Sequence, residues 1–261
     1  MRVFRIIVVW CLVALIWCIC IVKGCAQNVP LIKVSHDSFV SYYDQQLKNP
    51  ALVCYVLEWK HFSGNNRVAG RHFKADTKLP KPRVLDKDFT GSGYVRGHLC
   101  SAGDRDSDKK WLKETYLTSN LVPMTMVCNS GAWKVIEDSC RTLAKVGHRL
   151  IIARGPLYYD FVRSNANVVQ IGSGEAANVL RTRVGITIPD GFFCFAKCLD
   201  CGLTYQSWCQ NVGTRVLQDV IQDINGHPDE VLRFVRDDRV SVLLQNIIGT
   251  WSREVYETIT R

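Results

Sequence analysis

Runs of apolar residues separated by polar turns divide most of the chain into short strands. Residues 51–59 form one such run, rich in Val, Cys, Tyr and Leu, which predicts a strand. Similar patterns predict strands over residues 149–154, 184–188, 192–198 and 204–212. Pro189-Asp190-Gly191 predicts a turn between the strands over 184–188 and 192–198. Gly155-Pro156 ends the strand over 149–154. The strands do not alternate regularly with helices, so we predict an α+β fold with a central, mostly antiparallel sheet and helices on its faces.

One helix is predicted near the middle of the chain, because two sets of residues there repeat with helical spacing. Asn129, Trp133 and Glu137 are each four residues apart, so they lie along one side of the helix. Asn129 also stands where an N-cap residue would stand. A neighbouring apolar stripe would pack on the sheet, and it consists of Ile136, Cys140, Leu143 and Ala144.

The remaining segments have weaker patterns. Residues 35–47 predict a short helix or an irregular arm, and residues 111–115 predict a short helix. Residues 116–121 predict a strand that carries Asn120. Near the end of the sequence, residues 229–236 and 241–248 predict helices.

The first 26 residues read as a targeting segment. Arg2 and Arg5 give a basic start, residues 6–22 are apolar and uncharged, and small residues precede a cleavage point after Ala26. The apolar run is slightly shorter than the roughly 20 residues of a spanning helix, so removal as a signal peptide is favoured. We therefore expect a secreted or extracytoplasmic protein with a single domain over residues 27–261. Two alternatives place it at a membrane: retention of residues 6–22 as an anchor, or lipidation of Cys25.

The net charge is positive but moderate. The chain has 33 basic and 24 acidic residues, and the targeting segment contains Arg2, Arg5 and Lys23 but no acid. The basic excess that remains fits a polyanionic partner such as nucleic acid, although many exported proteins are equally basic. Basic and aromatic residues are spread along the chain, so no separate nucleic-acid-binding tail is predicted.

Cysteine usage leaves two interpretations open. Eight cysteines follow the targeting segment: Cys54, Cys100, Cys128, Cys140, Cys194, Cys198, Cys201 and Cys209. An even number in an exported chain predicts disulfides, with a pairing that the sequence does not determine. A bridge between Cys100 and Cys128 is one hypothesis. The spacing of the last four cysteines alternatively fits a zinc cluster.

Candidate chemistry is concentrated between residues 93 and 140. Phosphodiester hydrolysis needs a base to deprotonate water, a cation to hold the phosphate, and a way to neutralise the leaving oxygen. His98, Arg96 and the polar side of the predicted helix supply all three. The amide oxygen of Asn129 suits Mg²⁺, which keeps most of its waters and often takes one or two protein ligands. Glu137 would hold those waters as an outer ligand.

These residues stand in a pattern that resembles the DNA/RNA non-specific endonuclease family, which includes secreted bacterial nucleases and mitochondrial endonuclease G. The chain reads VRGH at 95–98, TSNLVP at 118–123 and NSGAW at 129–133, followed by Glu137. The flanking segments RHFKAD (71–76), DFTGSGY (88–94) and GPLYY (155–159) are similar to the family as well. The resemblance covers roughly residues 50–200 and implies the ββα-metal nuclease fold.

The resemblance implies a metal-dependent endonuclease that cleaves DNA and RNA with little sequence specificity and leaves 5′-phosphate ends. It implies that His98 is the general base and that Asn129 binds Mg²⁺, or Mn²⁺ or another divalent cation, directly. It further implies that Glu137 orients metal-bound waters, while Arg96 and Arg71 stabilise charge on the phosphate. A neutral histidine base predicts loss of rate below about pH 6.5.

One departure from the family pattern favours an alternative. Val95 stands where the family has Asp, and loss of that carboxylate would suit a catalytically impaired nucleic-acid-binding protein on the same scaffold. Single residues also have simpler interpretations: Asn129 as only a helix cap, or Glu137 as only an ion-pair partner of Arg141.

The alternating acids of residues 104–108 imitate the first half of an EF-hand loop. The required Gly and Glu positions hold Lys109 and Thr115 instead. We therefore expect a solvated loop or helix start there.

Overall fold

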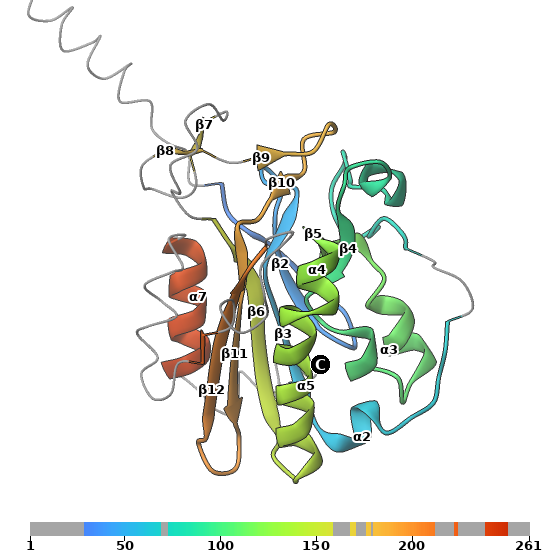
Figure 1. The fold of residues 1–261 in the computed structure, drawn as a ribbon, viewed down its shortest axis with the longest axis vertical. Coiled ribbons are helices and arrows are strands. Elements are labelled where there is room, and N and C mark those ends of the chain that lie inside the picture. Colours follow the sequence, from blue (N-terminus) through green and yellow to red (C-terminus); the bar gives the residue numbers. More distant parts are fainter. Residues whose placement is uncertain are drawn as a thin grey trace, which may run out of the picture.

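A seven-stranded antiparallel sheet runs through the middle of the molecule (Figure 1). Its order is β1-β2-β3-β6-β11-β12-β13, and each neighbouring pair is antiparallel. The strands are β1 (Ile32–Ser35), β2 (Val40–Asp44), β3 (Asn49–Leu57), β6 (Leu150–Leu157), β11 (Gly191–Cys198), β12 (Thr204–Gln210) and β13 (Gln222–Asp223). The predicted α+β class with a mostly antiparallel sheet is confirmed.

The computed structural model describes residues 29–68, 73–158, 168–170, 176–178, 180–211, 222–223 and 238–249. Its helices are α2 (Trp59–Phe62), α3 (Lys109–Glu114), α4 (Met126–Ser130), α5 (Ala132–Lys145) and α7 (Asp238–Gly249). Short 3₁₀ turns are η1 (Asp86–Phe89), η2 (Ala102–Asp104) and η3 (Thr118–Asn120). Three two-stranded ribbons complete the described elements: β4 (Val95–His98) with β5 (Leu121–Met124), β7 (Val168–Gln170) with β8 (Ala176–Asn178), and β9 (Leu180–Arg181) with β10 (Thr187–Ile188).

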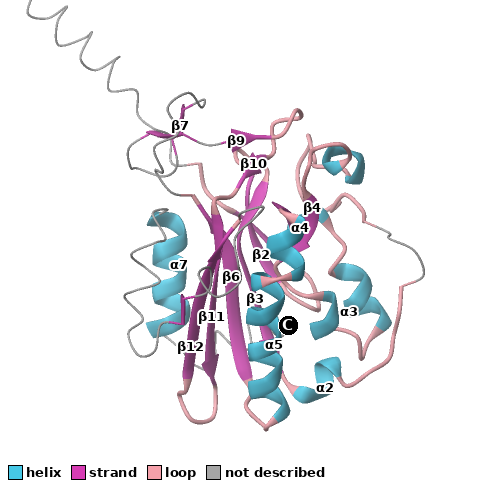
Figure 2. Cartoon of the chain, in the orientation of Figure 1, coloured by secondary structure: helices cyan, strands magenta, loops and turns pink. Residues whose placement is uncertain are grey.

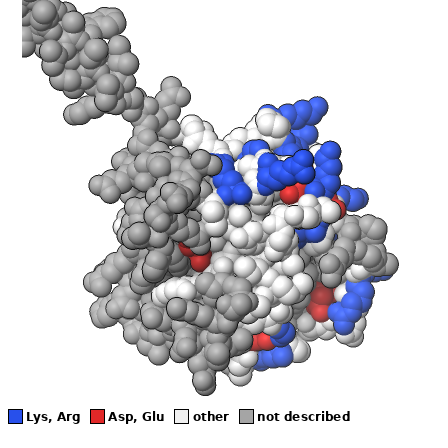
Figure 3. Space-filling model, turned by 45° about the horizontal axis from the view of Figure 1, so that its top comes forward, with Lys and Arg blue, Asp and Glu red and all other residues white. Residues whose placement is uncertain are grey.

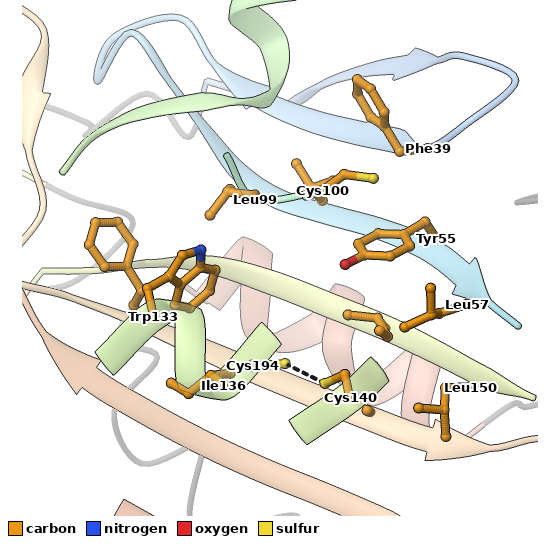
Figure 4. Close-up of a cluster of buried hydrophobic side chains, with 14 of the residues drawn as sticks. Phe39, Tyr55, Leu57, Leu99, Cys100, Trp133, Ile136, Cys140, Leu150 and Cys194 are labelled. Carbon is orange, nitrogen blue, oxygen red and sulfur yellow. Dashed lines mark hydrogen bonds between the residues drawn. The ribbon is translucent and has the colours of Figure 1, made fainter. Parts of the chain in front are cut away.

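Helices cover both faces of the sheet, which is why its central strands are apolar on both sides (Figure 2). Alternate residues of β3 take opposite sides: Tyr55 joins the core under α5, and Cys54 joins the core under α7. Figure 4 shows the first of these cores, with Trp133 and Ile136 of α5 facing the sheet. The predicted apolar stripe of this helix is therefore confirmed.

The predicted central helix is in fact two helices. Thr125 caps α4, because its Oγ1 accepts a hydrogen bond of 3.1 Å from the Cys128 amide. Gly131 then interrupts the helical path with φ −108° and ψ −106° and is the N-cap of α5. Asn129 thus lies inside α4, and the prediction that it is an N-cap is wrong. The four-residue spacing of Asn129 and Trp133 suited one helix, but glycine permits the break between them.

The segment 35–47 is a β-hairpin, so the prediction of a helix or irregular arm there is wrong. The His36 amide donates to the Phe39 carbonyl at 2.9 Å and closes the turn between β1 and β2. Val34, Val40 and Tyr43 are buried on the hairpin, and this burial decides the strand conformation.

Other boundaries differ in detail. Strand β6 continues through Gly155-Pro156 to Leu157, and Asn120 ends η3 instead of lying in a strand. Strand β10 is shorter than predicted and pairs with β9. Helix α7 confirms the predicted helix over 241–248, while the helix predicted over 229–236 lies outside the described residues.

Candidate active site

Strand β4 places Arg96 and His98 on the same face, two residues apart. Gly97 between them is required by close packing. A Cβ added there would lie 2.6 Å from the methyl carbon of Met124, well inside contact distance. The loop into this strand turns at Gly91 and Gly93, which have φ values of +70° and +83° that favour glycine.

The His98 ring is packed between two aromatic side chains. Its centroid lies 5.7 Å from that of Phe73 and 5.2 Å from that of Tyr116, whose ring is perpendicular to it. Its Nε2 atom is buried and has no hydrogen-bond partner in the described part of the chain. Burial lowers the pKa of His98 to about 4. His98 is therefore neutral near pH 7 and has a ring nitrogen free to accept a proton.

Backbone contacts fix the position of His98. The indole N–H of Trp133 donates to the His98 carbonyl at 3.0 Å and so ties α5 to β4. The side-chain oxygen of Asn120 accepts from the Cys100 amide at 2.7 Å, and its NH₂ donates to the Cys100 carbonyl at 2.9 Å. Trp133 and Asn120 thus both hold the segment that presents the histidine.

Asn129 is brought to this strand by its helix. Helix α4 packs against β4, and Asn129 is half-buried on it. Its amide oxygen and the carboxylate of Glu137 are oxygen donors of the type that hard divalent cations prefer. By the chemistry of their donor atoms, these residues fit a divalent cation.

Glu137 lies on α5 with its side chain 13% exposed. Its Oε2 accepts from the Ser101 hydroxyl at 3.2 Å and lies 3.6 Å from Nη2 of Arg141. Burial raises the pKa of Glu137 to about 7, against the opposing charge of nearby arginines. The carboxylate is thus poised to change charge near neutral pH.

A buried ionic network supports Glu137 from behind. Asp104 accepts from Arg141 at 2.7 Å and from the Tyr55 hydroxyl at 2.6 Å, and it is fully buried. Arg154, also fully buried, lies 2.5 Å from the Tyr55 hydroxyl and 3.4 Å from Asp104. The expectation of a solvated loop or helix start at 104–108 is wrong for Asp104, whose buried charge is compensated by two arginines. It is right for Asp108, which is the N-cap of α3.

Arg96 is engaged by the loop before β4. Its Nε pairs with the Asp86 carboxylate, and its Nη2 donates to the Asp86 carbonyl at 2.7 Å. The guanidinium lies over Phe73 and Phe89, at 5.3 and 5.6 Å from the ring centroids. The Arg96 guanidinium is therefore held in place, two residues along β4 from His98.

Two further residues of the predicted site have different outcomes. Arg71 lies outside the described residues, so the structure does not place it. Val95, which replaces the family Asp, packs against the apolar core under α5.

The eight cysteines of residues 27–261 are all unbridged in the structure, so it does not show the expected disulfides. Cys128 lies beside Cys209 rather than Cys100, with 3.8 Å between sulfurs, and Cys140 lies beside Cys194 at 3.7 Å (Figure 4). Both separations far exceed a disulfide bond of about 2.05 Å.

Comparison with known sequences finds nucleases. The chain is 33% identical to "Nuclease EXOG, mitochondrial" of Homo sapiens over 128 residues, which are 49% of this chain and 35% of that protein. It is 27% identical to human "Endonuclease G, mitochondrial" over 125 residues, 48% of this chain and 42% of that protein. A "Nuclease" of Nostoc sp. is 37% identical over 87 residues, 33% of this chain and 32% of that protein. The chain thus spans less than half the length of these relatives.

The names of these relatives contradict the expected secretion. Those from human, mouse and Schizosaccharomyces pombe are called mitochondrial. A basic start followed by an apolar run indicates targeting but does not by itself specify the compartment. No helix in the described segments has the length and hydrophobicity to cross a membrane, and residues 6–22 lie outside those segments.

A solved structure shares the fold. A chain in a crystal structure of the EndoG/EndoGI complex superposes with a TM-score of 0.62 at 22% identity, covering 78% of this chain and 83% of that one. A sequence model of the family described as "DNA/RNA non-specific endonuclease" matches residues 22–219, which is most of the chain. The chain therefore belongs to the DNA/RNA non-specific endonuclease family.

Proposed function

We propose that this protein is a metal-dependent endonuclease that hydrolyses phosphodiester bonds of DNA and RNA with little sequence specificity. The observation that carries the proposal is the His98 ring, whose buried Nε2 has no partner among the described residues and whose pKa is lowered to about 4. A neutral imidazole nitrogen without a partner can accept a proton from a bound water. Family membership and the nuclease relatives support the same activity.

In the proposed reaction, Nε2 of His98 takes a proton from a water molecule. The water oxygen forms a bond to phosphorus while the bond from phosphorus to the 3′-oxygen breaks in line. The departing 3′-oxygen takes a proton from solvent water, and the products carry a 5′-phosphate and a 3′-hydroxyl. Trp133 keeps His98 in position through its hydrogen bond to the backbone carbonyl.

Four other residues have proposed roles around the scissile phosphate. Asn129 is the direct protein ligand of Mg²⁺, or of Mn²⁺ or another divalent cation, and Glu137 holds the metal-bound waters. The bound cation supplies charge neutralisation at the phosphate and the leaving oxygen. Arg96 adds positive charge beside His98, and Arg71 is proposed to bind the phosphate from the preceding segment.

The charge distribution supports a nucleic-acid substrate. Figure 3 shows Lys and Arg side chains gathered over the end of the molecule that carries η1 and the β9–β10 turn. Exposed Lys87 belongs to η1 and exposed Arg183 to the β9–β10 turn, and exposed Lys81 lies in the loop before η1. Phosphate contacts of this kind bind many sequences alike and weaken as salt increases.

The test is digestion of plasmid DNA and of a structured RNA by purified protein, with Mg²⁺ and with chelator. We expect both substrates to be cut only with metal, and the new ends to carry 5′-phosphate by end-labelling. Activity that persists in chelator, or in the His98→Ala variant, would overturn the proposal.

A protein that binds both nucleic acids with full affinity and cuts neither would support the alternative, an impaired nucleic-acid-binding protein. The alternative rests on Val95, which packs in an apolar environment where the family has a carboxylate. The next variant would then be Val95→Asp, which restores the family residue.

We further propose that residues 1–26 are a targeting segment and that residues 27–261 are a single nuclease domain. The names of the relatives favour mitochondria as the destination. Microscopy of the full chain carrying a C-terminal fluorescent tag tests this location. Recovery of the tagged protein in the culture medium would contradict it.

A further inference from the structure

Three potential metal ligands meet at the end of the sheet opposite β4 and α4 (Figure 1). His148 lies in the loop between α5 and β6, while Cys198 and Cys201 lie at the turn between β11 and β12. Their ligand atoms all lie within 4.8 Å of one another. Among the described residues this is the only such group of three or more His, Cys, Asp or Glu side chains. The proposed nuclease reaction uses none of the three.

We propose that His148, Cys198 and Cys201 bind a zinc ion, with a fourth position open to water or another ligand. The site is separate from the proposed nuclease centre. It differs from the four-cysteine cluster suggested by spacing, because Cys194 and Cys209 lie beside Cys140 and Cys128 in the core.

The distances fit tetrahedral zinc. Nδ1 of His148 lies 3.4 Å from Sγ of Cys198 and 3.6 Å from Sγ of Cys201. Zinc–sulfur bonds of about 2.3 Å and zinc–nitrogen bonds of about 2.0–2.1 Å at tetrahedral angles place sulfur and nitrogen about 3.6 Å apart. One ion therefore reaches all three atoms without a large movement of either loop.

The two loops are fixed against each other by contacts that do not involve the ligands. Arg149 donates from Nε to both carboxylate oxygens of Asp200, at 3.0 and 3.1 Å. The Leu199 amide donates to the Arg149 carbonyl at 2.8 Å. His148 and the cysteines are thus held together before any ion binds, which reduces the ordering cost of binding.

The local backbone also presents the ligands. Helix α5 ends in a Schellman motif: the His148 amide donates to Leu143, and Gly147 has φ +101°. In the β11–β12 turn, the Gly202 amide donates to the Cys198 carbonyl at 3.1 Å, and Gly202 has φ +75°.

The two cysteines differ in their access to solvent. Cys198 is buried, whereas Cys201 is exposed and leaves one side of the site open to solvent. A disulfide between Cys198 and Cys201 is the competing chemistry for this pair.

The test uses Co²⁺ as a spectroscopic substitute for Zn²⁺ in the full chain, purified under reducing conditions. The Asn129→Ala background removes the proposed ligand of the nuclease centre. We expect one equivalent of Co²⁺ with a thiolate-to-cobalt charge-transfer band and the visible absorption of a tetrahedral ion, both displaced by Zn²⁺. His148→Ala and Cys201→Ser should each weaken binding at least about 100-fold, by comparison with losses at outer-shell positions.

Cys54→Ala is the matched control, because Cys54 is a free cysteine buried on β3 far along the chain from this site. It should retain the band unchanged. Absence of the thiolate band, or its persistence in Cys201→Ser, would overturn the proposal. Mass-spectrometric detection of a Cys198–Cys201 disulfide in protein prepared with excess zinc would overturn it as well. Nuclease activity does not enter these readouts, so the site and the proposed function fail independently.

Discussion

His36 and His98 are both packed in the protein, but their ring nitrogens have opposite surroundings. In the turn between β1 and β2, Nε2 of His36 lies 2.7 Å from Oδ2 of Asp76, and the same carboxylate accepts from Ser119 at 2.5 Å. On β4, Nε2 of His98 is buried without a partner in the described part of the chain. A satisfied nitrogen contributes to stability, whereas an unsatisfied buried nitrogen costs stability. The difference separates a structural histidine from one available for chemistry.

The largest expected effect is loss of turnover in His98→Ala. Removal of a general base lowers kcat by about 10²–10⁴-fold. Stability should fall less than in a variant that breaks a buried pair, because only ring packing against Phe73 and Tyr116 is lost. Initial rates of plasmid cleavage and urea unfolding of the same preparation measure the two effects. A variant that keeps normal kcat would remove His98 from the proposed mechanism.

The second effect is loss of stability in His36→Ala. His36→Ala removes one hydrogen-bond partner of the buried Asp76 carboxylate, and a buried polar group that loses its partner costs about 1–3 kcal/mol. Urea unfolding should show this loss. The kcat per folded molecule should stay within about twofold, since His36 contacts Asp76 and Phe39, which have no proposed role in the chemistry. If kcat instead fell as far as in His98→Ala, the contrast between the two histidines would be wrong.

The third prediction concerns Glu137→Gln, which removes the charge of a carboxylate that is proposed to act in the same site as His98. If Glu137 holds metal-bound waters, the half-saturating Mg²⁺ concentration should rise roughly 10–100-fold. Asp138→Asn is the matched control, because it removes the same charge from the next residue, whose carboxylate is 48% exposed and pairs with Lys134 as well as with Arg141. That control should change metal dependence little, as exposed ion pairs contribute little. Equal effects in both variants would indicate that the loss of one negative charge on α5, and not the loss of this particular carboxylate, changes the metal dependence.

The smallest effect is a shift in pH dependence. The pKa of Glu137 is raised to about 7, so the carboxylate gains a proton as pH falls through 7 and metal binding weakens. The half-saturating Mg²⁺ concentration should rise roughly tenfold between pH 6 and 5. Because the pKa of His98 is lowered to about 4, kcat at saturating metal should stay nearly constant from pH 5 to 8. A histidine with an ordinary pKa would lose rate below about pH 6.5, whereas the lowered pKa of His98 moves this loss to lower pH. A kcat that falls tenfold from pH 7 to 6 would contradict this expectation.

Sequence patterns predicted the sheet well, because its central strands are continuous apolar runs. They also singled out His98, Asn129 and Glu137 through their motif. The break at Gly131 escaped detection, since four-residue spacing is equally compatible with one helix or two. Local periodicity does not show where a backbone turns between helices.

The buried support of the site could not be predicted from local sequence. Asp104 and Arg154 are charged and 50 residues apart, and charged residues are most often exposed. Only the fold brings them together beneath α5. His148 escaped attention for the same reason, because the cysteines beside it are 50 and 53 residues away in sequence.

The close approach of Gly97 to Met124 restricts what can stand at position 97. A side chain there would meet Met124, because an added Cβ would lie within 3 Å of three of its atoms, and one of them is the Cβ of Met124 itself. Every residue except glycine carries that Cβ, so a shorter residue at 124 would relieve only part of the clash. In a mutational library, position 97 should therefore accept glycine alone, whichever side chain stands opposite it on β5.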